Sequence, residues 1–92
     1  MYEIKYSSRY KKNYKRIESN TTLVEELNTV VSLLIANDNP LPAKYRDHQL
    51  TGKYATFREC HVRPDWLLVY QKNKTELILL LIETGTHSQI FA

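Results

Sequence analysis

Three histidines and one aspartate are the residues of this chain best suited to proton transfer: His48, His61, His87 and Asp65. Histidine can both accept and donate a proton near neutral pH without special tuning. All three histidines fall near predicted loops or strand ends, outside the apolar stripes, so we expect accessible rings. A sheet in the C-terminal half can bring the ends of neighbouring strands together. The pattern therefore predicts an acid/base site.

Two other chemistries fit the spacing poorly. Successive histidines are at least 13 positions apart, and neither an H-x-x-x-H motif nor a pair of cysteines is present. We therefore expect no metal site and no cofactor. Cys60, the only cysteine, precedes His61 in a predicted strand, so the two side chains point to opposite faces. We expect Cys60 to be a small buried hydrophobe rather than a nucleophile.

Cleavage of RNA requires less from the protein, because the substrate supplies its own nucleophile, the 2′-hydroxyl. The protein adds a base, an acid and positive charge for the phosphate of the transition state. Trp66 and Phe91 offer flat surfaces for an unstacked base. Trp66 also fits a core position at a strand start, and Phe91 also fits an anchor for the C-terminal tail. Four cations near the histidines in the chain are candidates for phosphate binding: Arg46, Lys53, Arg58 and Arg63.

The helices and strands that must position these side chains follow from periodicity. Residues 2–6 alternate as a strand with one buried face. Ser8 is predicted to cap a first helix, and a second helix begins at a capping box of Thr22 and Glu25 and ends before Pro40. Residues 41–53 form an irregular basic loop. Strands are then predicted at 54–62, 66–72 and 76–84, the last of them central and apolar on both faces.

This order of elements predicts one α+β domain over residues 1–92. It consists of a helical hairpin packed on a mainly antiparallel four-stranded sheet in the order β-α-α-β-β-β. No signal peptide and no apolar run of membrane-spanning length are visible, so we expect a soluble cytoplasmic protein with no membrane partner.

Charge is unevenly distributed along the chain. The net charge is +3, residues 1–16 hold six Lys or Arg against one acid, and residues 17–43 hold four acids and no base. Such polarity suits RNA or a strongly acidic protein partner, although a solvated basic face gives the same pattern.

Three segments carry a resemblance to a known family: "DHQLTGKY" at 47–54, "FRECHVRPDWLLVY" at 57–70 and "GTHSQIF" at 85–91. They resemble signature segments of the YafQ-type toxins, a branch of the RelE superfamily of bacterial toxin–antitoxin systems. The resemblance implies a RelE-like fold and a ribosome-dependent mRNA endonuclease, held silent by an acidic antitoxin like RelB or DinJ. It places the family's working positions on His48, His61, Asp65 and His87, and its aromatic positions on Trp66 and Phe91.

One residue departs from the family pattern. Members commonly carry a basic residue two places before the glycine of the last motif, where this chain has Glu83. A carboxylate close to the scissile phosphate would oppose the developing negative charge. Three alternatives stay open: Glu83 points away, or Arg58 or Arg63 substitutes for the missing cation, or activity is weaker.

Roles follow as expectations. His87, on a tail after Gly85, is the general acid, whereas His48 and Asp65 are candidates for removing the 2′-hydroxyl proton. His61 orients or charges the phosphate, and Pro64 directs it toward the same cleft as Asp65. One alternative is a basic module that binds RNA or the ribosome without cutting. Another, a small histidine-dependent hydrolase, is disfavoured because no phosphate loop or nucleophile motif is present.

Overall fold

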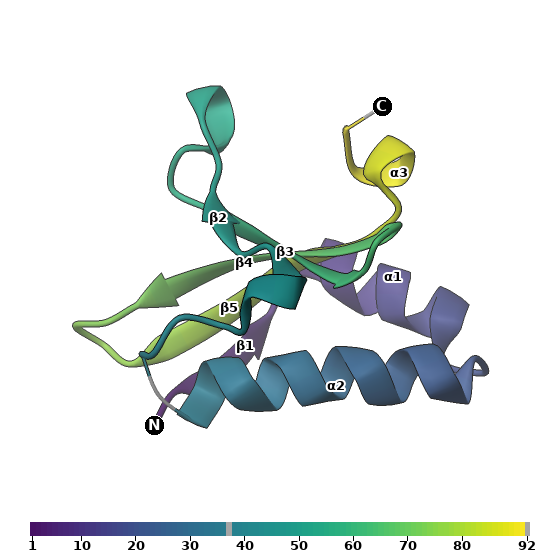
Figure 1. Ribbon diagram of the computed structural model, residues 1–92, viewed down its shortest axis with the longest axis horizontal. Coiled ribbons are helices and arrows are strands. Elements are labelled where there is room, and N and C mark those ends of the chain that lie inside the picture. The colour runs from purple at the N-terminus through teal and green to yellow at the C-terminus, as the bar shows by residue number, and fades with distance from the viewer. Residues whose placement is uncertain (37, 92) are drawn as a thin grey trace.

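The computed structural model describes residues 1–36 and 38–91, which fold into a five-stranded sheet with two long helices and one short helix. The α+β class is confirmed, with five strands in place of the predicted four. In chain order the elements are β1 (Glu3–Tyr6), α1 (Ser8–Ile17), α2 (Thr21–Ala36), η1 (Ala43–Tyr45), β2 (His48–Gln49), η2 (Gly52–Tyr54), β3 (Arg58–Arg63), β4 (Trp66–Asn73), β5 (Ile78–Gly85) and α3 (His87–Phe91) (Figure 1).

The sheet has the strand order β1-β5-β4-β3-β2. β1 pairs with β5 in parallel, and the other neighbours are antiparallel. One face carries the core, in which side chains of β3, β4 and β5 pack against α1 and α2. Figure 1 shows α2 on this side of the sheet and α3 and η2 on the other. β5 is an interior strand as predicted, with Leu79 and Leu81 fully buried and the alternate residues half-buried.

Both long helices begin slightly earlier than predicted. The N-cap of α1 is Ser7, whose Oγ accepts a hydrogen bond from the backbone N–H three residues later, so the predicted cap at Ser8 is wrong by one position. Asn20 caps α2 in the same way, because its Oδ1 accepts a hydrogen bond from the backbone N–H of Leu23. The observed cap lies two positions before the predicted Thr22. Both oxygens satisfy N–H groups that have no partner within the helix. Within the described residues, no helix is long and apolar enough to span a bilayer.

The segment 41–57 differs most from expectation. The predicted irregular loop contains the two-residue strand β2, paired antiparallel with β3, and two short 3-10 helices. β3 begins only at Arg58, because residues 52–54 turn rather than extend. β5 begins after Leu77, whose φ of 57° lies in the left-handed region and closes the preceding turn. The tail forms the short helix α3.

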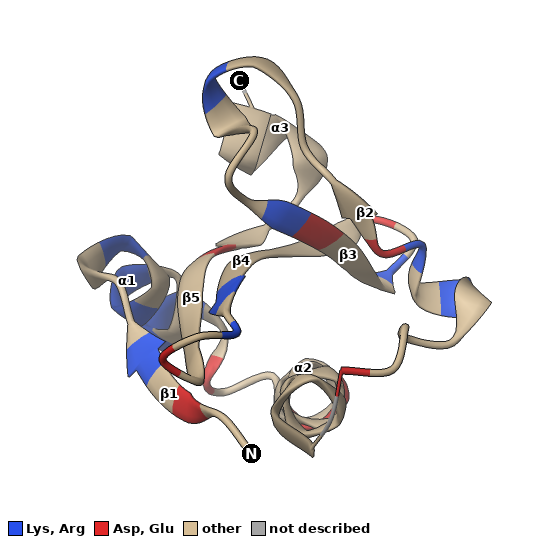
Figure 2. Ribbon diagram, turned by 90° about the vertical axis from the view of Figure 1, so that its left-hand side faces the viewer, with Lys and Arg blue, Asp and Glu red and all other residues tan. Residues whose placement is uncertain are grey.

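The charge asymmetry of the sequence becomes a spatial one. α1 carries five Lys or Arg residues and no acid, whereas α2 carries no Lys or Arg. Figure 2 shows the basic residues along α1, with further ones on the loops around β2 and β3. Most of the positive charge therefore lies on α1 and on the segments around β2 and β3.

Candidate active site

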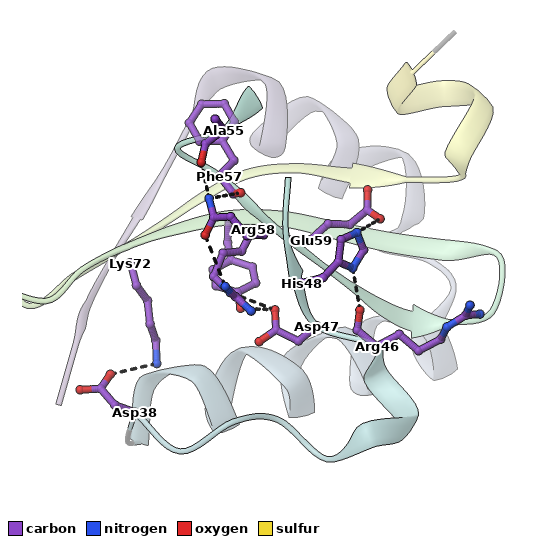
Figure 3. Close-up of polar contacts among 11 residues, drawn as sticks. Asp38, Arg46, Asp47, His48, Ala55, Phe57, Arg58, Glu59 and Lys72 are labelled. Atoms are coloured by element: carbon purple, nitrogen blue, oxygen red, sulfur yellow. Dashed lines mark hydrogen bonds and ion pairs between the residues drawn. The ribbon is translucent and has the colours of Figure 1, made fainter. Parts of the chain in front are cut away.

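Strands β2 and β3 bring two of the predicted histidines to one carboxylate. His48 lies directly opposite Glu59, and His48 Nε2 is 3.4 Å from Glu59 Oε1 (Figure 3). His61 follows Glu59 by two positions in β3, so both side chains lie on one face of the sheet. His61 Nε2 is 3.9 Å from the same oxygen, and the two ring centres are 6.5 Å apart. We call His48, Glu59 and His61 the histidine–glutamate cluster.

Backbone carbonyls hold both imidazole rings. His48 Nδ1 is 2.8 Å from the carbonyl oxygen of Arg46, and His61 Nδ1 is 3.3 Å from that of Pro64. A carbonyl oxygen only accepts hydrogen bonds, so we assign the donor hydrogen to Nδ1 in both rings. The lone pair of a neutral ring is then on Nε2, beside the carboxylate. A proton taken up there forms a charge-assisted pair with Glu59, so the cluster can accept and release one proton.

Glu59 is the member of this cluster that the sequence analysis missed. The residue is only 4% exposed, and its Oε2 has no hydrogen-bond partner in the described part of the chain. Burying a carboxylate costs free energy unless positive charge or hydrogen bonds offset it. A glutamate two positions before His61 in a predicted strand was the available signal, because such residues share a face.

A second polar network lies behind the cluster, on the other face of β3. Asp47 Oδ1 accepts a hydrogen bond of 2.6 Å from the Tyr70 hydroxyl and one of 3.3 Å from Arg58 Nε. Burial, followed by the hydrogen bond to Asp47, raises the pKa of Tyr70 above its ordinary value, so the phenol remains a neutral donor. Gln49 joins this network to the loop, since its side chain donates to the carbonyls of Ala55 and Phe57. The network holds β2 at its position in the sheet (Figure 3).

Arg58 belongs to this network and not to the histidine–glutamate cluster. It pairs across the sheet with Tyr70, on the face opposite to its neighbour Glu59. Its guanidinium contacts Asp47 and also donates to Gln49 Oε1 at 3.3 Å. The structure therefore does not bring Arg58 to the cluster.

Two of the other predicted cations, Arg63 and Lys53, have partners of their own. Arg63 Nε donates to Glu26 Oε1 at 2.7 Å, which ties β3 to α2. Arg63 nevertheless lines a groove of about 460 Å³ together with Arg46 and His61. Lys53 lies on η2, with Nζ 5.2 Å from the ring centre of Tyr54. Of these cations, the structure places Arg46 and Arg63 in the same groove as a cluster histidine.

The C-terminal residues form a separate group. His87 opens α3 and is exposed, and its ring centre is 5.1 Å from that of Phe91. Phe91 in turn meets the edge of Tyr54, with the ring centres 5.7 Å apart, so α3 is docked against η2. In the described chain, no hydrogen bond, ion pair or ring contact joins His87 to the cluster.

Asp65 and Trp66 stand at the turn between β3 and β4. Asp65 is exposed, one position after Pro64, whose carbonyl holds His61. Trp66 is half-buried, and its Nε1 donates to the hydroxyl of Thr84 at 2.8 Å. Its ring packs against the core and also lines a groove beside α1, so the two predicted roles of Trp66 are compatible.

Glu83 has a partner that the sequence analysis did not consider. Its side chain is 14% exposed, and Oε2 lies 3.6 Å from Nη1 of Arg9 on α1. Arg58 and Arg63 are paired with other acids. The cation closest to Glu83 thus comes from the N-terminal helix.

Cys60 is fully buried, as predicted. Burial raises the pKa of its thiol well above the ordinary value, which disfavours the nucleophilic thiolate. Among residues 1–36 and 38–91, no group of three or more His, Cys, Asp or Glu side chains is arranged to hold a metal ion.

Comparisons with known proteins agree with this arrangement. Residues 2–92 match a family described as the bacterial toxin of a type II toxin–antitoxin system, YafQ. The mRNA interferase toxin YafQ of Escherichia coli K12 is 39% identical over 89 residues, which are 97% of this chain and 95% of that protein.

Solved structures share the whole fold. Crystal structures of YafQ from E. coli BL21(DE3) and of the E. coli DinJ–YafQ complex have TM-scores of 0.89 and 0.88, with 34% and 35% identity and full coverage of both chains. A metal-bound toxin from Helicobacter pylori is 42% identical, with a TM-score of 0.88 over 99% of this chain and 100% of that one. This chain therefore belongs to the YafQ family of bacterial toxins.

Proposed function

We propose that this chain is the toxin of a type II toxin–antitoxin system and cuts mRNA on the ribosome, in the cytoplasm. The observation that carries the proposal is the histidine–glutamate cluster, in which two imidazole nitrogens lie 3.4 and 3.9 Å from one carboxylate oxygen. This arrangement can exchange a proton. The E. coli relative is named an mRNA interferase, and acid/base chemistry of this kind is what RNA cleavage requires.

The reaction uses the RNA as its own nucleophile. A base removes the proton of the 2′-hydroxyl, whose oxygen attacks the adjacent phosphorus, and the bond from phosphorus to the 5′ oxygen breaks as an acid protonates that oxygen. His48 and Asp65 are the candidate bases, and His61 orients or charges the phosphate. His87 is the candidate acid, with Phe91 beside it to stack on a base. We propose that no metal ion takes part, so removal of transition metals should leave the rate unchanged.

The phosphate of the transition state also needs positive charge. Arg46 and Arg63 line the same groove as His61, and the partner of Arg63, Glu26, has a side chain 42% exposed. Exposed ion pairs contribute little to stability, so a phosphate can compete for this guanidinium. Lys53 adds charge from η2, whereas Arg58 acts through the network that holds β2.

The test is to map the 5′ ends of mRNA after induced expression. A reporter mRNA with a start codon is compared with the same mRNA whose start codon has been removed. We expect new 5′ ends only in the translated reporter, and none with the His48→Ala or His87→Ala variants. Cutting of both reporters would contradict ribosome dependence.

The same experiment separates cleavage from its alternative, a basic module that blocks translation without cutting. Such a module would arrest growth and leave mRNA ends unchanged. It would also tolerate His87→Ala, because its electrostatic binding would depend on the Lys and Arg residues.

The second part of the proposal is an acidic antitoxin like RelB or DinJ. The solved complex of E. coli YafQ with DinJ supports such a partner. The basic residues of α1 and of the loop 44–53 (Figure 2) suit an acidic segment that folds as it binds. Binding of the cognate antitoxin should weaken as salt rises, and affinity independent of salt would contradict the electrostatic account.

A further inference from the structure

A groove of about 680 Å³ runs between α1, the end of β5 and α3. Three cations of α1, Arg9, Lys12 and Arg16, line it together with Trp66 and one carboxylate, Glu83. We call it the α1 groove. The histidine–glutamate cluster contributes none of its three residues to this groove. The chemistry of the groove therefore has to be explained separately from that of the cluster.

The cations of the groove lie along one face of α1. Positions 9, 12 and 16 follow the three- and four-residue spacing of a helix face and extend over about 10 Å of the axis. The remaining lysines of the helix, Lys11 and Lys15, line a different groove, between α1 and α2. The helix α1 thus has two basic faces, and each face lines a different groove.

The charge of the α1 groove is only partly neutralised. Arg9 is paired with Glu83 at 3.6 Å. Lys12 and Arg16 are exposed and, in the described part of the chain, have no acidic partner within 4.0 Å. Three cations face one carboxylate, so the groove attracts an anion along its whole length.

The aromatic ring of Trp66 is a second feature of the α1 groove that indicates a nucleic-acid ligand. Trp66 is held by the hydrogen bond from its Nε1 to Thr84, so its ring has a fixed position in the lining of the groove. A row of cations next to a fixed aromatic ring matches the sites that bind single-stranded RNA, in which the cations follow the phosphates and a base stacks on the ring.

We propose that the α1 groove binds the phosphodiester backbone of RNA, with Lys12 and Arg16 on successive phosphates and Trp66 against a base. Glu83 limits this binding by neutralising Arg9. The inference rests on the proposed function for its biological meaning, but the groove's affinity can be measured without cleavage.

The experiment uses a 2′-O-methyl RNA oligonucleotide, which lacks the attacking hydroxyl and cannot be cut. Trp66 is the only tryptophan of the chain, so its fluorescence reports occupancy of the groove directly. The test variant is Lys12→Gln with Arg16→Gln, and the matched control is Lys11→Gln with Lys15→Gln. Both remove two charges from exposed positions of the same helix, and thermal melting checks that both remain folded.

We expect the oligonucleotide to quench Trp66 in the parent and the control with similar affinity. The test variant should bind on the order of tenfold more weakly at moderate salt. Its plot of log affinity against log salt should be shallower by about 1.4, because two contacts to a single strand are lost. Glu83→Gln should bind more tightly than the parent, a gain that a damaged fold cannot mimic.

Two further arms identify the source of the RNA and exclude another ligand. Ribosomes without mRNA replace the oligonucleotide in the first, and a selective loss there assigns the phosphates to ribosomal RNA rather than to the message. A polyglutamate peptide replaces it in the second. Three results would overturn the proposal. Both double variants could weaken binding equally, the test variant could bind both RNA ligands with unchanged affinity, or its loss of affinity could be confined to polyglutamate. Failure of the parent to cut mRNA would instead contradict the proposed function alone.

Discussion

His48 Nε2 and Glu59 Oε1 lie 3.4 Å apart because β2, only two residues long, pairs its first residue with Glu59 on β3. This pairing places a buried carboxylate between two imidazoles from different segments of the chain. The geometry of the histidine–glutamate cluster is thus a product of strand register.

Glu59→Gln should abolish most of the cleavage while leaving the fold intact. The amide keeps the shape but cannot hold a protonated imidazole, and loss of acid/base function costs about 10²- to 10⁴-fold in rate. Stability should not fall, because a buried carboxylate with one unpaired oxygen is itself costly. Cleavage on ribosomes and urea denaturation measure the two effects, with the exposed Glu25→Gln as control. A destabilised variant with normal cleavage would contradict the catalytic role.

His87→Ala should abolish toxicity and preserve binding to ribosomes and antitoxin. Its neighbour Ser88, also exposed on α3, provides the control variant Ser88→Ala. A substrate whose 5′ leaving oxygen is replaced by sulfur needs no proton to depart, so His87→Ala should recover on it if His87 is the general acid. A variant equally slow on both substrates would assign His87 to another step.

Tyr70→Phe should loosen β2. The change removes the 2.6 Å hydrogen bond to Asp47, and loss of a buried hydrogen bond to a charged group costs about 1–3 kcal/mol in the free energy of unfolding. Cleavage should decrease too, because β2 carries His48. The control is Tyr14→Phe, a half-buried tyrosine of α1. Equal stability of the two variants in urea denaturation would show that the network does not hold β2.

The protein should lose stability above pH 10. The hydrogen bond to Asp38, together with burial, raises the pKa of Tyr2 from 10.0 to about 12. Burial raises the pKa of Tyr10 as well. The folded state therefore binds these phenol protons more tightly than the unfolded state, and the stabilisation is complete below pH 10 and is lost as the pH rises through 12. Tyrosinate absorbance should rise in two stages, and Tyr2→Phe should flatten the decline in melting temperature between pH 10 and 12.

The sequence by itself determined the elements with strong local patterns. Helical spacing of apolar residues located α1 and α2, and the apolar run 77–82 located β5, because these patterns act over one or two turns or a few pleats. The three signature segments identified the family, and the burial of Cys60 followed from its type and its strand. Helix starts were misplaced by one or two residues, since either of two neighbouring polar residues could supply the cap.

Only the tertiary structure decided which side chains meet. A strand of two residues has no period, so the pairing of β2 with β3, and with it the role of Glu59, depends on contacts between segments. The partners of the arginines are similarly distant: Arg63 binds Glu26, and Arg9 binds Glu83. The sequence shows only the sign of the charge that a given side chain attracts. The fold decides which opposite charge is near, because the free energy of an ion pair depends on distance and burial.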